Sequence, residues 1–318
     1  MIEVERLEKS YGFARALKGI SFRVSKGEVI GFLGPNGAGK STTMKILTGY
    51  LLPSGGRASV AGHDVVDDSL AVRACIGYLP ESTPLYAEMR VDEYLRFCAD
   101  IRGIPAGRRG AAIARAVELC GLSRVTGKNI VELSKGYKQR VGLAQAIVHE
   151  PPVLILDEPT SGLDPNQIVE VRKLIERLGQ EHTVVLSTHY LQEVEKSCTR
   201  VIIVNQGEIV ADGTRAELMA RQPAGAVRLC VRGPEASVTA QLRELLPAGT
   251  PVTVVARAAD LIEILVDAPP GGVPLEETIA RLVVKNGWDL LELQRQRATL
   301  EDVFRSLTMQ RQQEALHA

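Results

Sequence analysis

The eight residues Gly34-Pro35-Asn36-Gly37-Ala38-Gly39-Lys40-Ser41 decide the fold of this chain. They fit the pattern G-x-x-x-x-G-K-[ST], follow the apolar run 29–33 and lead into a helical run over residues 42–48. Glycines in such a loop let consecutive backbone N–H groups point at phosphate groups, and the helix N-terminus adds positive potential. A glycine-rich turn that only caps a helix is the alternative, but the strand–loop–helix context favours a phosphate-binding loop, or P-loop.

The residues of this loop have separate expected roles. Lys40 is expected to bridge the β- and γ-phosphates of a bound nucleotide. Ser41 is expected to offer its hydroxyl to Mg²⁺, a hard ion that prefers oxygen ligands. The other residues expected to contact the nucleotide are Gly34, Pro35, Asn36, Gly37, Ala38, Gly39 and Thr42.

A second apolar run, residues 153–156, ends in two adjacent carboxylates, Asp157 and Glu158. Because successive side chains of a strand point in opposite directions, the two carboxylates can take separate roles. Asp157 is expected to bind Mg²⁺ through water, and Glu158 to polarise the water that attacks the γ-phosphate. Taken alone, the pair fits an ordinary strand end equally well. Together with the P-loop it favours a nucleotide-hydrolysing site.

Short apolar runs bounded by Gly or Pro alternate with segments of helical period, which predicts an α/β core with a mainly parallel sheet. Buried strands are expected at residues 29–33, 153–156 and 183–187, and a hairpin at residues 201–211 is expected at the sheet edge. Residues 80–149 are helical in pattern and are interpreted as an inserted helical subdomain. We place this core and its insertion in a first domain, residues 1–222.

A linker with Pro and Gly follows, and a smaller α+β domain is predicted over residues 226–318. Its element order, βαββαβ, is typical of the ferredoxin-like arrangement. A last helix is expected at about residues 300–312. A role in regulation or in dimer stabilisation is favoured over an inert appendage. The predicted strands are 227–232, 252–256, 262–266 and 290–294, and the predicted helices are 235–246 and 275–286.

The overall composition argues against several classes of protein. Basic and acidic residues balance at 38 each, so no nucleic-acid partner is expected. The longest apolar runs fall far short of the ~20 residues of a membrane-spanning helix, and the acidic N-terminal segment is unlike a signal peptide. The five cysteines form no C-x-x-C pair, so neither a metal cluster nor a disulfide framework is indicated. We therefore expect a cytoplasmic protein.

Residues 133–140, Leu-Ser-Lys-Gly-Tyr-Lys-Gln-Arg, precede the two carboxylates by a short helix, and this order resembles the ABC ATPase family. In that family the motif reads Leu-Ser-Gly-Gly-Gln, so Ser134 and Gly136 are kept while Lys135 and Tyr137 differ. A hydroxyl, a glycine backbone and a helix N-terminus still form an anion receptor. In isolation, a serine-capped helix start is the favoured interpretation of this segment.

Further segments match in the family's order. Residues 161–164 resemble its D-loop, so Asp164 is expected both at the nucleotide and at a helix N-cap. His189 resembles the switch histidine that contacts the γ-phosphate, and Tyr11 resembles the aromatic residue that stacks on adenine. Glu81 stands where the family usually has a glutamine that touches Mg²⁺ and the attacking water. A carboxylate can also bind the metal, but it cannot donate an amide hydrogen bond.

The resemblance is specific over residues 1–220 and loose beyond them. It implies an ATP-hydrolysing subunit that uses ATP and Mg²⁺, with Lys40, Glu158 and His189 as catalytic residues. It also implies a head-to-tail homodimer that encloses ATP between one copy's P-loop and the other's Ser134 and Gly136. Membrane-spanning permease subunits are the implied partners, which would dock near residues 81–86 and hold the chain at the inner face of the cell membrane.

Residues 84–86 and 298–304 look most like ATPase subunits of ABC-2-type exporters, including those associated with gliding motility. Three other classes are weighed against this one. Translation-associated ABC proteins normally carry two cassettes, and chromosome or repair ATPases carry a long coiled coil, whereas this chain has one P-loop and no heptads. A module in which bound ATP only signals is left open by the sequence.

Overall fold

The computed structural model describes residues 1–220, 226–247, 250–258, 261–267, 275–295 and 299–304. The chain forms two compact units, Met1–Thr214 and Arg215–Ala318. The boundary predicted at residues 222–226 puts the short helix α8 (Arg215–Ala220) in the first domain, whereas its contacts put it in the second unit.

The first unit is built on a six-stranded sheet with the strand order β10-β9-β3-β8-β7-β6. Its strands are β3 (Val29–Leu33), β6 (Ile76–Leu79), β7 (Val153–Asp157), β8 (Thr183–Thr188), β9 (Arg200–Asn205) and β10 (Glu208–Thr214). All neighbours pair in parallel except β10, which pairs antiparallel with β9 at the edge. Every residue of β3, β7 and β8 is buried, as parallel strands covered on both faces require. The three predicted strands and the edge hairpin are confirmed.

A second, antiparallel sheet was not predicted. It has the order β2-β1-β4-β5 and consists of β1 (Ile2–Tyr11), β2 (Ala14–Val24), β4 (Gly55–Val60) and β5 (His63–Asp64). Its inward side chains, among them Ile2, Val4 and Phe22, share one core with Phe32 of the central sheet and Met44 of α1. This sheet therefore packs against both β3 and α1, the two elements that the P-loop connects.

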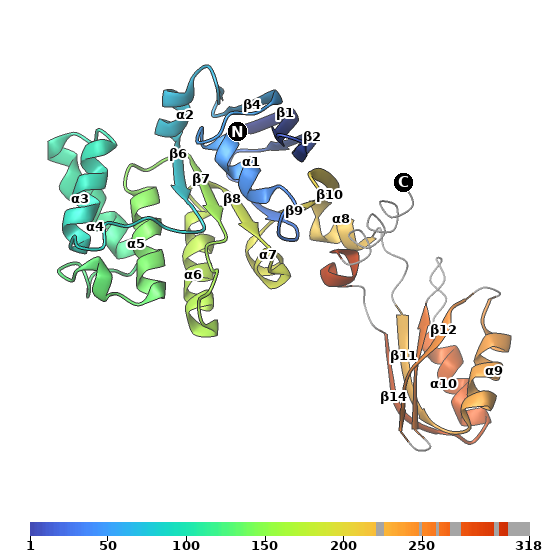
Figure 1. The fold of residues 1–318 in the computed structure, drawn as a ribbon. Coiled ribbons are helices and arrows are strands. Elements are labelled where there is room, and N and C mark those ends of the chain that lie inside the picture. The colour runs from blue at the N-terminus through green and yellow to red at the C-terminus, as the bar shows by residue number, and fades with distance from the viewer. Residues whose placement is uncertain (221–225, 248–249, 259–260, 268–274, 296–298, 305–318) are drawn as a thin grey trace. The chain divides into compact units, whose positions relative to one another are not determined.

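Helices cover the central sheet and build the predicted subdomain (Figure 1). They are α1 (Lys40–Leu47), α2 (Ser69–Cys75), α3 (Val91–Ile101), α4 (Ala106–Leu119), α5 (Lys135–Ile147), α6 (Pro165–Leu178) and α7 (Leu191–Ser197), with a 3₁₀ turn at Ile130–Glu132. Leu95, Ala116 and Leu143 of the subdomain share a core with Leu156 and Leu186 of the sheet. None of the helices within the described residues has both the length and the apolar character needed to cross a membrane.

The second unit has the predicted order βαββαβ. Its elements after α8 are β11 (Ala226–Arg232), α9 (Glu235–Leu245), β12 (Val252–Ala258), β13 (Leu261–Asp267), α10 (Leu275–Lys285) and β14 (Asp289–Arg295). The sheet order is β12-β13-β11-β14 and all its pairs are antiparallel. Leu229 and Ile264 of the sheet pack with Ile279 of α10 in one core. Of the last predicted helix, residues 300–304 are helical and the rest lies outside the described residues.

Gly77 of β6 tests how tightly α5 packs on the sheet, and Gly110 of α4, which has open surroundings, is the control. A Cβ on Gly77 of β6 would overlap the Ala146 carbonyl oxygen of α5 and lie 2.7 Å from Cδ2 of Leu154. Gly77→Ala is therefore expected to lower the free energy of unfolding by about 1–3 kcal/mol through overpacking. Gly110 of α4 has no heavy atom within 4 Å of such a Cβ, so Gly110→Ala is expected to raise it by about 0.5–1 kcal/mol.

Urea unfolding followed by circular dichroism measures both changes. If Gly77→Ala leaves the urea midpoint unchanged, the backbone of β6 at Gly77 does not lie against the Ala146 carbonyl of α5.

Candidate functional site

The P-loop joins β3 to α1, and neighbouring strands fix its backbone. A Cβ on Gly34 would overlap the Val204 carbonyl oxygen of β9. Gly39 has a φ of +106° and a Cβ there would lie 2.7 Å from Cδ2 of Leu17 on β2. Both positions therefore require glycine. At Gly37, with a φ of +79°, nothing lies within 4 Å of the same position, so this side of the loop is open to a phosphate group.

Lys40 is held inside the loop that it follows. Its ammonium group donates to the carbonyl oxygens of Gly34 at 2.7 Å and Pro35 at 3.3 Å. The same nitrogen lies 3.5 Å from Oε1 of Glu158, and both side chains are almost fully buried. A buried cation needs acceptors of this kind, and phosphate oxygens are charged acceptors that could replace the carbonyls.

Ser41 and Asp157 meet where α1 begins and β7 ends. The Ser41 hydroxyl donates to Oδ1 of Asp157 at 3.2 Å. Burial raises the pKa of the Asp157 carboxyl, the Ser41 hydrogen bond opposes that rise, and the charges of Glu158 and Glu81 add to it. A divalent cation would relieve this accumulation of negative charge, and hydroxyl and carboxylate oxygens are the ligands that Mg²⁺ prefers. The residues present therefore fit the metal.

The described residues contain no cluster of three or more His, Cys, Asp or Glu side chains that could hold a metal by themselves. Mg²⁺ commonly keeps several waters and is bound by one or two side chains together with substrate phosphates. The pair Ser41 and Asp157 matches that arrangement, because it lies beside the P-loop rather than in a closed cage of protein ligands.

Glu158 joins the P-loop to the end of β8. Its Oε2 lies 2.8 Å from Nδ1 of His189, while its Oε1 faces Lys40. Its backbone has a φ of +49°, a left-handed conformation that is uncommon outside glycine and is concentrated at functional sites. The three predicted catalytic residues are therefore in one place, with the carboxylate between the ammonium group and the imidazole.

Ser134, Gly136 and Asp164 form a second group, at the starts of α5 and α6. Ser134 caps α5 by accepting from the Tyr137 backbone N–H at 3.4 Å. Asp164 caps α6 by accepting from the Gln167 N–H at 2.9 Å, and a Cβ on Gly136 would lie 2.7 Å from Cδ of Gln167. Among the described residues, no hydrogen bond or ion pair connects this group to the P-loop of the same chain.

Tyr11 and Glu81 complete the predicted set. Tyr11 ends β1 with 51% of its surface exposed, and the Lys9 ammonium group lies 5.3 Å from the centre of its ring. Its ring is therefore available for stacking. Glu81 is exposed just beyond β6, and its negative charge contributes to the raised pKa of the Asp157 carboxyl.

A buried polar cluster next to Glu158 was missed in the sequence. Glu193 of α7 accepts hydrogen bonds from the hydroxyls of Thr160 and Thr188, and all three residues are almost fully buried. In the sequence, nothing about a glutamate on a short helix indicates that its side chain is buried. Only its position four residues after His189 could have drawn attention to it.

Comparison with known proteins was consistent with this geometry. The family model described as ABC transporter matches residues 17–161, and a model of an AAA domain matches residues 129–195. The linearmycin resistance ATP-binding protein LnrL of Bacillus subtilis (strain 168) is 33% identical over 97% of this chain and 98% of its own length. The daunorubicin resistance ATP-binding protein DrrA3 of Streptomyces coeruleorubidus is 36% identical over 96% of this chain and 95% of its own length.

Among solved structures, cbiO1 from Clostridium perfringens, part of the ABC transporter complex cbiONQ, is 30% identical. The match covers 77% of this chain and 95% of cbiO1, with a TM-score of 0.63. Relatives above 30% identity span nearly the whole of both chains, and the P-loop, Glu158 and His189 lie together in the structure. The chain therefore belongs to the ABC transporter family of ATPases, as an ATP-binding subunit.

Proposed function

We propose that this chain is the motor of an ABC-2-type exporter, in which ATP-driven closure of a homodimer powers transport through separate membrane permease subunits. The contact of the Glu158 carboxylate with both Lys40 and His189 carries the proposal, because it puts a base beside a phosphate-binding loop. Relatives named for resistance to linearmycin and daunorubicin support the export of a small molecule. The narrower resemblance to gliding-motility exporters stays a prediction.

In this proposal the P-loop N–H groups and Lys40 bind the β- and γ-phosphates. Ser41 and Asp157 would hold Mg²⁺ beside the phosphates, and Glu81, whose charge acts on Asp157, is the third candidate ligand. When bound, Mg²⁺ neutralises the charge that develops on the phosphate oxygens during transfer. Tyr11 stacks on the adenine ring, for which its exposed face is suited.

Glu158 acts as the general base. Its Oε2 is occupied by the hydrogen bond with His189, which orients the carboxylate. Its Oε1 faces Lys40 at 3.5 Å, and phosphates that engage Lys40 leave this oxygen free to accept a proton from the attacking water. His189 then has one ring nitrogen on Glu158 and the other available for the γ-phosphate.

The separation of the two groups of site residues supports a dimer. Ser134, Gly136 and Asp164 lie together at the starts of α5 and α6, and no hydrogen bond or ion pair of the described residues joins them to their own P-loop. A second copy placed head to tail supplies them to the first copy's ATP, so that ATP becomes part of the interface. Hydrolysis removes γ-phosphate contacts that only the closed dimer makes, which is how it biases the opening of the dimer.

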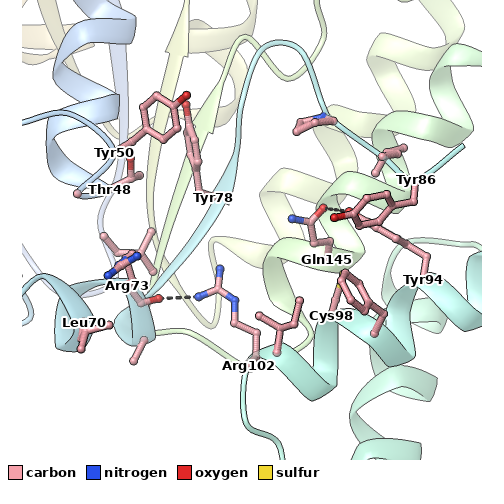
Figure 2. A pocket seen from close by; sticks show the side chains of 17 residues that line it. Thr48, Tyr50, Leu70, Arg73, Tyr78, Tyr86, Tyr94, Cys98, Arg102 and Gln145 are labelled. Carbon is pink, nitrogen blue, oxygen red and sulfur yellow. Dashed lines mark hydrogen bonds between the residues drawn. The ribbon is translucent and has the colours of Figure 1, made fainter.

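A groove beside the helical subdomain suits the permease (Figure 2). It has a volume of about 870 Å³ and is lined by aromatic and aliphatic side chains with two cations, Arg73 and Arg102, and no carboxylate. Leu70, Tyr86 and Ile101 are exposed on it by 76%, 58% and 68%. An amphipathic cytoplasmic helix with an acidic residue complements this surface. Docking there would hold the chain at the inner face of the cell membrane.

Replacing Glu158 by glutamine tests the proposed base. Glu158→Gln keeps the shape of the side chain but cannot accept a proton, so phosphate release is expected to fall by at least about 100-fold. Mg-ATP binding, measured by calorimetry, should persist. Glu176→Gln, an exposed change on α6, is the matched control and should keep the parent rate. A Glu158→Gln protein that hydrolyses ATP as fast as the parent would show that Glu158 is not the base.

Removing the P-loop cation tests nucleotide binding itself. Lys40→Ala is expected to weaken Mg-ATP binding about tenfold or more and to lower turnover, because a charge-assisted contact to phosphate is lost. Lys45→Ala on the exposed side of the same helix should change neither. Unaltered affinity and turnover in Lys40→Ala would contradict the assignment of the P-loop.

A charge placed in the groove tests permease docking. Tyr86→Asp is expected to abolish co-purification of the chain with a permease from its host's membranes, because it puts a carboxylate into an apolar contact. Mg-ATP binding should be unaffected. Val131→Asp, at an exposed apolar residue that does not line the groove, is the control. Undiminished co-purification of Tyr86→Asp would place the permease contact elsewhere.

A further inference from the structure

A carboxylate that the hydrolysis scheme does not use lies next to Glu158 and His189. Glu193, in the first turn of α7, is 4% exposed. One of its oxygens accepts from the Thr160 hydroxyl, and the other accepts from the Thr188 hydroxyl at 2.8 Å. No ion pair of the described residues includes Glu193. Burying a carboxylate without a cation is unfavourable, so its presence calls for a reason beyond stability.

The two threonines belong to the two segments that carry the catalytic pair. Thr160 comes two residues after Glu158, and Thr188 directly precedes His189. Glu193 therefore links the segment that follows β7 to the end of β8 through its two oxygens, next to the Glu158–His189 contact.

The hydrogen bonds at Thr188 also have a defined direction. The Thr188 oxygen accepts from the Tyr190 backbone N–H at 3.0 Å, so its single proton is available for Glu193. Burial raises the pKa of the Glu193 carboxyl, and the hydrogen bonds from Thr160 and Thr188 oppose that rise by stabilising the charged form. As an acceptor on both oxygens, the carboxylate fixes both hydroxyls at once.

We propose that Glu193 is a positioning residue for hydrolysis, which holds the Glu158 and His189 segments at a fixed separation through Thr160 and Thr188. The inference rests on the proposed role of Glu158 as the base. Glu193 acts through these two threonines, to which both of its oxygens are bonded. It keeps the 2.8 Å contact between Glu158 and His189 in place while phosphates and water enter, and a displacement of about 1 Å in such a pair can lower a rate by about 100-fold.

Removing the hydroxyls tests the link from both ends. Thr188→Val and Thr160→Val keep the shape of the side chain but break the bond to Glu193. Each is expected to lower kcat for ATP hydrolysis about tenfold or more and to change the Kd for Mg-ATP less than about threefold. Thr188→Ser restores the hydroxyl and should return kcat to near the parent value.

Thr183 provides a matched control on the same strand. It lies at the opposite end of β8, is 1% exposed and accepts from the Gly27 backbone N–H at 2.9 Å. Thr183→Val therefore removes a buried hydroxyl far from Glu193 and should lower Tm while leaving kcat unchanged. If Thr183→Val lowers kcat as much as Thr188→Val, the effect is general destabilisation and the proposal is overturned.

Glu193→Gln supplies an independent test, which also serves if Thr188→Val does not fold. It should lower kcat to a similar extent, and Glu193→Gln combined with Thr160→Val should be no slower than the slower single variant. Parent-like kcat in Glu193→Gln and in both valine variants overturns the positioning role. That result is distinct from failure of the proposed function, which would appear as parent-like turnover of Glu158→Gln.

Discussion

The buried contact of Lys40 with Glu158 is the interaction on which the site depends. Both residues are 5% exposed, and removing one partner would leave the other buried without its counter-charge, which is unfavourable. They come from segments far apart in sequence, and the strand order β3-β8-β7 brings them together. Because parallel strands end at the same edge of a sheet, the P-loop after β3, His189 after β8 and Glu158 after β7 must converge.

This convergence also explains why the left-handed backbone of Glu158 is tolerated. Its N–H donates to the Ser187 carbonyl at 2.9 Å, which ties the residue to β8 just before the strand ends. The side chain is then turned toward Lys40 and His189, whereas Asp157, one residue earlier, meets Ser41. A left-handed backbone thus gives the two adjacent carboxylates different partners, Ser41 for Asp157 and the pair Lys40 and His189 for Glu158.

The sequence predicted those parts of the fold that depend on local patterns. β3, β7 and β8 are continuous apolar runs, and their ends were located to within one residue. The antiparallel sheet was missed because its pairing shifts register after Val4 and its chain turns left-handed at Arg6, which breaks the alternation of apolar residues. Within the stretch predicted to be helical, the start of α4 at Ala106 is hard to locate from the sequence, because Gly107 and Gly110 weaken its helical pattern. The burial of Glu193 depends on tertiary contacts that no short pattern records.

Helix α5 connects the groove to the segment expected to face a partner's ATP. At the groove, the Tyr94 hydroxyl donates to Gln145 near the end of α5 at 2.5 Å. At the other end of α5, Lys135 packs against Gly162, and Arg140 pairs with Glu170 of α6. Helix α5 is therefore in contact with the groove through Gln145, and with the segments before and along α6 through Lys135 and Arg140. Lys135, which departs from the family pattern, lies against Gly162 and so connects the start of α5 with the segment that leads into α6.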